Sequence, residues 1–284
     1  MTNKKIVISL LLTLCFYSLC FAKENNNQDV KEPYYTIDFM IVLCNVEIKV
    51  NDISIFSMEI KGQVGTAIPA NNAIFKSGEQ KLSIELKPLA GETQFREYTE
   101  ARFAVELIDA SNFVTISNEP VENFKASDHA PMEKLYKEYS FHAEVPYTIT
   151  ILDEAQDLRT IPDLENKLKN SYMELISLIE QKNFSEFEAI ARAKEVKYAQ
   201  MFYLSEAESS KRVESIIKKL KSGEYKLNPF PAEVTLHIKA DGKVASLKNK
   251  NDNEILTFTG EDDEELGVIY SFYLPKGSDK FVAY

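Results

Sequence analysis

The chain has 284 residues, of which 44% are hydrophobic and 27% charged, and its formal net charge is −11. This composition is typical of a folded globular protein with one or two domains, so it excludes a mini-protein, a fibrous repeat and a disordered chain. The negative charge argues against nucleic acid as a ligand, and no motif indicates a cofactor. No catalytic or binding motif identifies a function, so the functional prediction depends on targeting, charge and architecture.

Residues 1–22 have the pattern of a secretory signal peptide. Two lysines precede an apolar run, and Cys20-Phe21-Ala22 places small residues at the minus-three and minus-one positions of a cleavage site. We therefore expect cleavage after Ala22 and a periplasmic or secreted mature chain without a transmembrane span. Two alternatives stay open. Lipidation of Cys20 is disfavoured by the bulky Leu19, and an uncleaved anchor is disfavoured by the polar residues within the apolar run.

Cleavage would leave Cys44 as the one cysteine of the mature chain, so no intrachain disulfide could form. The apolar run Met40-Ile41-Val42-Leu43 before it favours a buried small hydrophobe over a reactive thiol or an interchain disulfide. Cleavage would also remove two lysines and make the mature chain more acidic. That charge would suit a basic protein partner through electrostatic steering, although solubility alone accounts for it equally well.

The mature chain divides into a flexible polar leader over residues 23–33, a β-sandwich domain over 34–152 and an α+β domain over 153–284. In the sandwich we expect strands at residues 35–43, 46–50, 53–60, 81–86, 101–108, 113–116 and 139–152. The pair Asn51-Asp52 tolerates the positive φ angles of a tight hairpin turn. Alternating apolar and polar residues with no helix between the strands predict an antiparallel, immunoglobulin-like sandwich.

Two longer segments interrupt these strands. Residues 68–80 contain turn-forming residues around Ile74 and Phe75, and we expect a structured loop anchored by that apolar pair. Residues 118–134 contain two prolines and little periodicity, so they predict an irregular crossover between sheets. The alternative for this second loop is a contact surface for a partner.

Residues 153–222 contain three segments with helical periodicity. The first follows Thr160, which we expect to cap it, and its apolar stripe comprises Leu164, Leu168, Tyr172, Leu175, Ile176 and Ile179. The second and third begin with Ser185 and Ser205, each followed three residues later by a glutamate, which predicts a capping box. Gly223 is expected to end the third helix.

Strands return at residues 233–239, 243–248, 254–259 and 268–274, and Asp241-Gly242 marks a hairpin. Helices followed by hairpins predict an α+β unit in which the helices cover one face of a sheet. A curved roll of the nuclear-transport-factor or cystatin type fits this order of elements. That comparison concerns the fold alone and predicts no function.

The chain has three histidines, and these supply most of the candidate contact residues. His142 and Glu144 lie opposite the apolar face of their predicted strand, and His237 does the same in its own strand. Together with Asp128 and His129 in the long loop, these residues are the expected ligand or partner contacts. His129, His142 and Glu144 could approximate a zinc site, but HExxH and paired-cysteine spacings are missing, so we predict no metal.

The remaining candidates are weaker. Residues 260–265, Gly-Glu-Asp-Asp-Glu-Glu, predict a solvated acidic turn, with weak calcium binding or a basic partner as alternatives. The sequence has no nucleophile elbow and no cysteine-peptidase signature, and no spacing distinguishes a catalytic carboxylate pair from surface charge. The absence of tryptophan removes the commonest platform for sugar stacking.

These observations favour a non-enzymatic, exported binding protein of the bacterial envelope that binds a protein or a small ligand in its α+β domain. A sharper form of this hypothesis is an inhibitor or immunity-type protein that neutralises a basic partner. The alternative is an envelope hydrolase that uses carboxylates of the α+β domain, with His237 nearby. A structural module of an envelope assembly is the third possibility.

Overall fold

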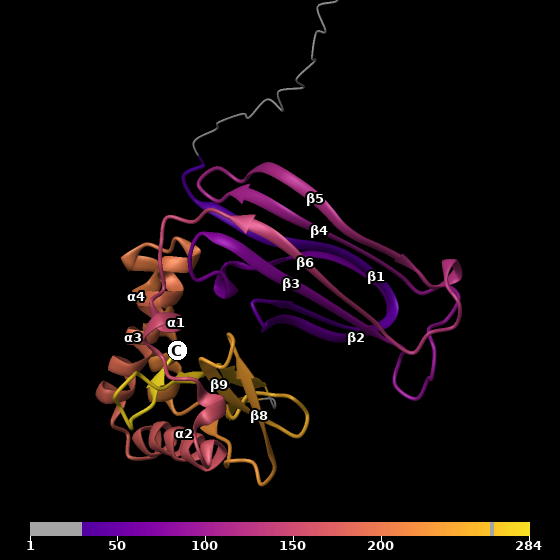
Figure 1. Ribbon diagram of the computed structural model, residues 1–284. Coiled ribbons are helices and arrows are strands. Elements are labelled where there is room, and N and C mark those ends of the chain that lie inside the picture. The colour runs from indigo at the N-terminus through magenta and orange to yellow at the C-terminus, as the bar shows by residue number, and fades with distance from the viewer. Residues whose placement is uncertain (1–29, 262–263) are drawn as a thin grey trace, which may run out of the picture. The chain divides into compact units, whose positions relative to one another are not determined.

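The computed structural model describes residues 30–261 and 264–284 (Figure 1). The predicted signal peptide and most of the predicted leader lie outside these residues. Residues Lys31–Tyr284 form one compact unit with a mixed α+β fold. A six-stranded antiparallel sheet, curled into a half-barrel, comes first; three helices and two small antiparallel sheets follow. Within the described residues, no helix combines the length and hydropathy needed to cross a bilayer.

The strands of the first sheet are β1 Pro33–Val50, β2 Ile53–Pro69, β3 Gly78–Lys87, β4 Glu100–Asp109, β5 Val114–Lys125 and β6 Leu135–Ala143. Strand β1 organises the sheet because it pairs with three others. It pairs with β2 along most of its length, while its residues 33–42 also pair with β4 and residues 45–50 also pair with β3. Strands β5 and β6 extend the sheet beyond β4 and β3. Two strands predicted separately at residues 35–43 and 46–50 are therefore one continuous strand.

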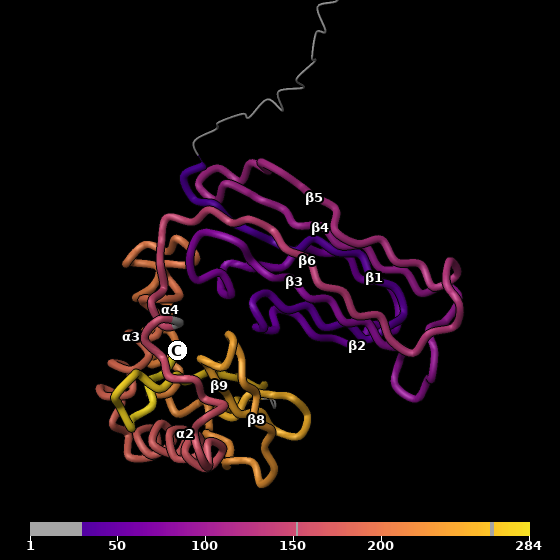
Figure 2. Tube along the Cα trace, in the orientation of Figure 1, coloured from indigo at the N-terminus to yellow at the C-terminus, as the bar shows by residue number. Residues whose placement is uncertain are grey.

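The alternation of buried side chains in β1 changes phase at Leu43. Tyr35, Ile37, Phe39 and Ile41 are buried at odd positions, but beyond Leu43 the buried positions become even. Leu43 has φ 56°, and the pairing of β1 with β2 shifts between Val42 and Cys44. Here β1 advances two residues while β2 advances three, from Gln63 to Ile60, so the extra residue of this β-bulge lies in β2 opposite Leu43. The left-handed conformation of Leu43 returns the apolar side chains of β1 to the inner face. Figure 2 shows the curved paths of β1 and β2.

The antiparallel pairing predicted for residues 34–152 is confirmed, but the immunoglobulin-like arrangement of two sheets is not, because the six strands form a single sheet. Alternation in the sequence shows that each strand has one buried face. It does not distinguish two stacked sheets from one bent sheet whose halves share an inner face. The hairpin at Asn51-Asp52 is confirmed, since both residues have positive φ and Val50 pairs with Ile53.

The two predicted long segments have different outcomes. Ile74 and Phe75 are buried, as expected, beside a short 3-10 helix, η1 Asn71–Ala73. The predicted crossover at residues 118–134 is wrong, because β5 continues to Lys125 and the 3-10 helix η2 Ala126–Asp128 follows it. Pro120 misled the prediction. It lies at a register shift of β5, which pairs with β4 alone, and a strand tolerates proline at such a position.

Beyond β6 the chain leaves the sheet. The strand predicted at residues 139–152 ends at Ala143, ahead of Pro146, and residues 151–154 form the short helix α1 Ile151–Glu154. The 3-10 helix η3 Leu158–Thr160 follows. Thr160 belongs to this turn and does not cap the next helix, for which Asp163 is the N-cap residue.

The three predicted helices are present as α2 Leu164–Glu180, α3 Phe184–Phe202 and α4 Glu206–Ser222. All six residues of the predicted α2 stripe are buried. The capping box of α4 forms between Ser205 and Glu208, and Gly223 ends that helix with φ 77°. The capping box predicted at Ser185 does not form, because Asn183 is the N-cap residue of α3. The Ser185 hydroxyl instead donates to the side chain of Asn183.

The two small sheets consist of β7 Lys226–Leu227 with β10 Leu256–Thr259 and β11 Glu265–Val268, and of β8 Val234–Lys239 with β9 Val244–Asn249, β12 Phe272–Tyr273 and β13 Val282–Ala283. The predicted hairpin at Asp241-Gly242 connects β8 to β9. Tyr172 connects α2 to β9 and to the segment before β12. Its hydroxyl donates to the carbonyl of Tyr270 at 2.7 Å and accepts from the amide of Leu247 at 3.3 Å.

Two apolar cores stabilise the fold, one inside the curled sheet and one among the helices and small sheets. Helix α3 contributes to both, with Phe187 in the helical core and Met201 in the sheet core. Buried Asn71 ties the same helix to β1. Its side chain accepts from the amide of Tyr35 at 2.7 Å and donates to the carbonyl of Met201 at 3.1 Å.

Candidate functional site

The structure separates most of the predicted contact residues. Asp128 ends η2 and is exposed, and the adjacent His129 is exposed but stacks on Phe124 of β5 at 5.4 Å between ring centroids. His142 lies near the other end of β6 with its Nε2 3.8 Å from an oxygen of Glu144, and both side chains are largely exposed. The residues that could approximate a zinc site therefore form two separate groups. Among the described residues, no group of three or more potential ligands could hold a metal ion.

His237 has a different environment. It lies on β8, partly buried, with Nε2 3.5 Å from Oδ1 of Asp252. Burial lowers the pKa of His237, and the nearby Lys239 and Lys248 act in the same direction, whereas Asp252 and Glu47 raise it. These neighbours come from β1, β8, β9 and the connection after β9, so His237 lies where distant segments of the chain meet.

Two further sequence candidates have structural roles. Cys44 is fully buried, as expected, and burial raises the pKa of its thiol to about 12, which keeps it in the unreactive thiol form. Residues 262–263 of the predicted acidic turn lie outside the described residues. Within the described part of that turn, Glu264 accepts a hydrogen bond from the hydroxyl of Tyr225 at 2.8 Å.

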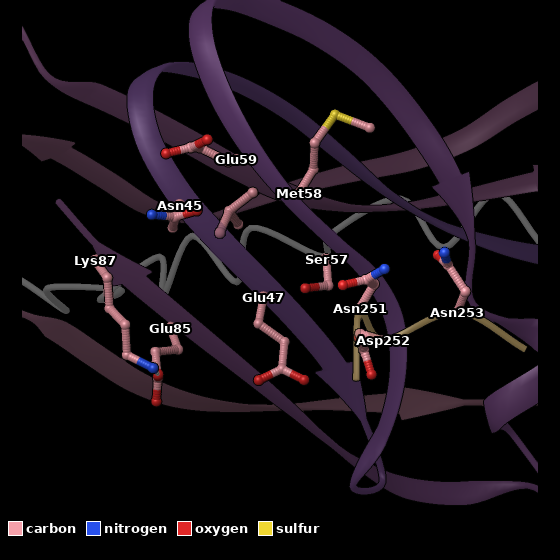
Figure 3. Close-up of a pocket in the computed structure, with 11 residues that line it drawn as sticks. Asn45, Glu47, Ser57, Met58, Glu59, Glu85, Lys87, Asn251, Asp252 and Asn253 are labelled. Atoms are coloured by element: carbon pink, nitrogen blue, oxygen red, sulfur yellow. Dashed lines mark ion pairs between the residues drawn. The ribbon is translucent and has the colours of Figure 1, made fainter. Parts of the chain in front are cut away.

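The first hollow of the surface, the acidic hollow, has a volume of about 600 Å³ and is lined mainly by oxygen-bearing side chains (Figure 3). Its carboxylates have partners already. Glu59 pairs with Lys61 at 3.0 Å and accepts from the amide of Ala90, while Glu85 pairs with Lys87 and Lys134. Because these pairs satisfy the carboxylates, the acidic hollow is a polar, solvated surface.

The second hollow, the lysine cleft, has a volume of about 370 Å³, within the range of about 300–1,000 Å³ that is typical of small-molecule sites. Its walls come from the curled sheet, from α3 and from the small sheets. The lining residues are Glu47, Ile53, Ser54, Ser57, Asn72, Lys194, Lys197, Tyr198, Met201, His237, Lys239, Val244, Lys248, Asp252, Glu254, Ile269, Ser271 and Tyr284.

Each of the three carboxylates of the lysine cleft has a basic side chain beside it, although His237, with its lowered pKa, is uncharged at neutral pH. Glu47 pairs with Lys49 at 3.0 Å, and Asp252 pairs with His237. Glu254 pairs with Lys248, and both of these side chains are mostly buried. These pairs use two of the five basic side chains in the lining, His237 and Lys248.

The other three basic residues, Lys194, Lys197 and Lys239, form no ion pair within the described part of the chain. The Lys194 ammonium lies over the ring of Tyr270, 5.3 Å from its centroid, and that of Lys197 lies 4.8 Å from the centroid of Tyr273. Burial lowers the pKa of all three lysines. The cleft therefore holds three partly desolvated ammonium groups that lack an ion-pair partner among the described residues, although Glu254 acts electrostatically on Lys194 and Lys239.

Two uncharged features complete the lining. Part of the lining is an apolar wall, which consists of Ile53, Met201, Val244 and Ile269. The Oδ1 atom of Asn72 is buried and lacks a hydrogen-bond partner, which is unusual for a polar atom in a folded protein. The cleft can thus combine charge, apolar contact and hydrogen bonding in one small volume.

A possible nucleophile also lies here. The Lys239 ammonium is 3.5 Å from the hydroxyl oxygen of Ser271, and both residues line the lysine cleft. Ser246 stands opposite His237 in the pairing of β8 with β9, but its hydroxyl is buried, makes no hydrogen bond and is not part of the lining. The structure therefore contains a serine–lysine contact, while a serine–histidine–aspartate triad is not assembled at His237.

Sequence reasoning identified His237 and missed the lysines. Lys194 and Lys197 are three residues apart on α3 and so share a helix face, but this spacing is equally common on a solvated surface. Lys239 is more than forty residues away in the sequence. Only the fold, which places residues of α3 and β8 in the lining of one cleft, brings the three together. Comparison of the chain with protein-family models, curated proteins and solved structures finds no match.

Proposed function

We propose that the protein is an exported, non-enzymatic binding protein of the bacterial envelope and that the lysine cleft is its ligand site. The single observation that supports this is the cleft itself, which combines an apolar wall with charged groups in a volume suited to a small molecule. Of the two kinds of partner predicted from the sequence, a protein and a small ligand, this geometry favours the small ligand. The roll-type fold predicted for residues 153–284 remains part of the proposal.

A variant that fills the cleft tests the proposal. Ser54 lies on β2, is exposed and lines the cleft, so Ser54→Trp adds a large side chain without disturbing a core. We expect small molecules retained by the purified wild-type protein, identified by mass spectrometry, to be absent from this variant. Gln63→Trp, at an exposed position of the same strand outside the cleft lining, is the matched control. Equal retention by all three proteins would contradict the proposal.

A separate measurement tests whether the protein is exported. N-terminal sequencing of the protein from the periplasmic or extracellular fraction should begin at Lys23, because cleavage is proposed after Ala22. A chain that starts at Met1 and remains in the cytoplasmic fraction would contradict this part of the proposal. The cleft proposal would be unaffected by that result.

A second function, hydrolysis, is favoured by the contact between Ser271 and Lys239. In this alternative the Ser271 hydroxyl attacks an ester or amide carbonyl while neutral Lys239 accepts its proton. The tetrahedral intermediate then expels the leaving group, which takes up that proton, and water hydrolyses the acyl–serine ester to release the acid and regenerate Ser271. A buried lysine with a lowered pKa suits the role of base. A fluorophosphonate probe should then label wild-type protein at Ser271 but not Ser271→Ala. If intact-mass analysis detects no adduct on the wild-type protein, this alternative is removed.

A further inference from the structure

The charges of the lysine cleft specify the chemical class of its ligand, an inference that depends on the function proposed above. Glu47 is paired with Lys49 and Glu254 with Lys248, whereas Asp252 contacts His237, whose lowered pKa leaves the imidazole uncharged at neutral pH. Three ammonium groups remain, two from α3 and one from β8, and they outnumber this one carboxylate. An acidic protein therefore has a local excess of positive charge in its cleft.

We propose that the lysine cleft binds an amphipathic organic acid, whose single anionic head contacts Lys194, Lys197 and Lys239 and whose apolar body packs on the wall of Ile53, Met201 and Ile269. Charge-assisted hydrogen bonds from ammonium groups to an oxyanion are the strongest polar contacts such a cleft can offer. The apolar wall adds the hydrophobic contribution that a bare inorganic anion could not use.

The partial burial of the three lysines favours the binding of an anion. Each free lysine loses hydration in the cleft, which lowers its pKa. A bound anion would compensate this cost. The lysines also require little rearrangement, since the rings of Tyr270 and Tyr273 already position two of the ammonium groups.

The same lining limits the ligand to one anionic head. Glu47, Asp252 and Glu254 line the cleft too, and a second negative charge on the ligand would have to lie beside one of them. Glu254 acts electrostatically on both Lys194 and Lys239, so part of their charge is already balanced. A single carboxylate with an aliphatic or aromatic body therefore fits the cleft better than a polyanion does.

Isothermal titration calorimetry with three probes of equal chain length tests the charge requirement. Octanoate, octanol and octylammonium share the apolar body and differ only in the head group. We expect octanoate to bind at least about tenfold more tightly than octanol, and octylammonium to bind most weakly. Added salt should weaken octanoate more than octanol, because it screens the contact between the head group and the lysines.

Charge-removing variants locate the contact. Lys194→Gln, Lys197→Gln and Lys239→Gln should each weaken octanoate binding about tenfold and leave octanol unchanged. Lys218→Gln, at an exposed position of α4 outside the cleft, is the matched control and should bind as the wild type does. Thermal melts of the three variants without ligand should match or exceed the wild type, because each removes a desolvated charge. A loss of binding therefore cannot be attributed to unfolding.

The outcomes separate this inference from the proposed function. If octanol binds the wild type as tightly as octanoate does, and Ser54→Trp abolishes both, the cleft is a ligand site but the anion requirement is wrong. If octanoate fails to bind, or binds Ser54→Trp as well as it binds the wild type, the inference is overturned. Retention of a native ligand that Ser54→Trp loses would still support the cleft in that case.

Discussion

The curled sheet and the helical region build their cores in different ways. In the sheet, a core side chain comes from every second residue of long strands, and the left-handed conformation of Leu43 keeps the apolar side chains of β1 on the inner face. In the helical region, the core comes from stripes on α2 and α4, closed by short strands. Helix α3 serves both cores, and the lysine cleft lies beside it. The proposed ligand site thus lies where two kinds of packing meet.

The largest expected effect tests whether the two cores unfold together. Phe187 of α3 is fully buried in the helical core, so Phe187→Ala should lower the free energy of unfolding by about 3–5 kcal/mol. Urea unfolding would be followed by far-UV circular dichroism for the helices and by the fluorescence of a Phe56→Trp reporter for the sheet. Because Met201 of the same helix packs in the sheet core, both transitions should shift together.

The matched control for this measurement is Val196→Ala. Val196 also lies on α3 but is 65% exposed, so its truncation should change stability by less than about 0.5 kcal/mol. If Phe187→Ala moves the helical transition and leaves the reporter transition unchanged, the cores are independent. That result would support the domain boundary predicted at residue 152.

The next effect concerns the polar link between the regions. Asn71→Ala should cost about 3 kcal/mol, because it leaves the buried amide of Tyr35 and the carbonyl of Met201 without their partner. Asn72→Ala is the matched control, since the side-chain oxygen of the neighbouring Asn72 has no hydrogen-bond partner. Chemical denaturation should show a near-neutral effect for Asn72→Ala. Equal losses for the two variants would show that the hydrogen bonds of Asn71 do not stabilise the link.

A smaller effect compares two serines that look alike in the sequence. Ser205→Ala should destabilise the protein by about 1 kcal/mol, because it breaks the capping box with Glu208. Ser185→Ala should change stability by less than about 0.5 kcal/mol, since Ser185 does not cap α3. Thermal or urea unfolding of the two variants measures the difference. A larger loss for Ser185→Ala would mean that its bond to Asn183 matters more than the cap.

These contrasts show which features the sequence could predict. The stripe of α2 and the cap at Ser205 were predicted correctly because each depends on residues within one or two helical turns. The change of phase around Leu43 was visible in the sequence, but it has two physical outcomes, a break between strands or a bulge within one. Because β1 pairs with β2 on both sides of Leu43, the strand continues through a bulge. That pairing depends on the whole sheet and leaves no local signal.

The candidate site illustrates the same limit. His237 was selected because it lies opposite an apolar strand face, and it does line the lysine cleft. The same strand pattern predicted His142 and Glu144, and the long loop at residues 118–134 predicted Asp128 and His129, yet none of these four lines either hollow described above. The three free lysines lack a distinguishing local pattern. Their significance comes from the fold, which brings residues of α3 and β8 to one cleft, and from the absence of ion-pair partners for them within the described residues.

The environment of His237 predicts a dependence of stability on pH. Burial lowers the pKa of His237 in the folded protein, so the unfolded chain binds a proton at higher pH than the folded chain does. The stability contributed by the neutral imidazole is present above its ordinary pKa of about 6.5 and is lost as the pH falls through the lower folded value. The free energy of unfolding should therefore decrease more on acidification in the wild type than in His237→Gln. His142→Gln, at an exposed strand end, is the matched histidine control. The assignment would be contradicted if the pH dependence of the free energy of unfolding became weaker in His142→Gln but not in His237→Gln.

The smallest expected effect is a gain in stability in the β1–β2 turn. Asp52 is exposed and has φ 62°, a conformation that glycine adopts without steric cost, so Asp52→Gly should stabilise the protein by about 0.5 kcal/mol. Asn51 has φ 50° in the same turn, but its side chain donates to the carbonyl of Ala73 at 2.8 Å and accepts from the amide of Lys81 at 3.0 Å. Asn51→Gly should consequently destabilise the protein, because the lost hydrogen bonds outweigh the relief of backbone strain. Opposite signs for two adjacent turn residues, measured by thermal unfolding, would show that the turn also anchors β3, and equal signs would show that it only connects β1 to β2.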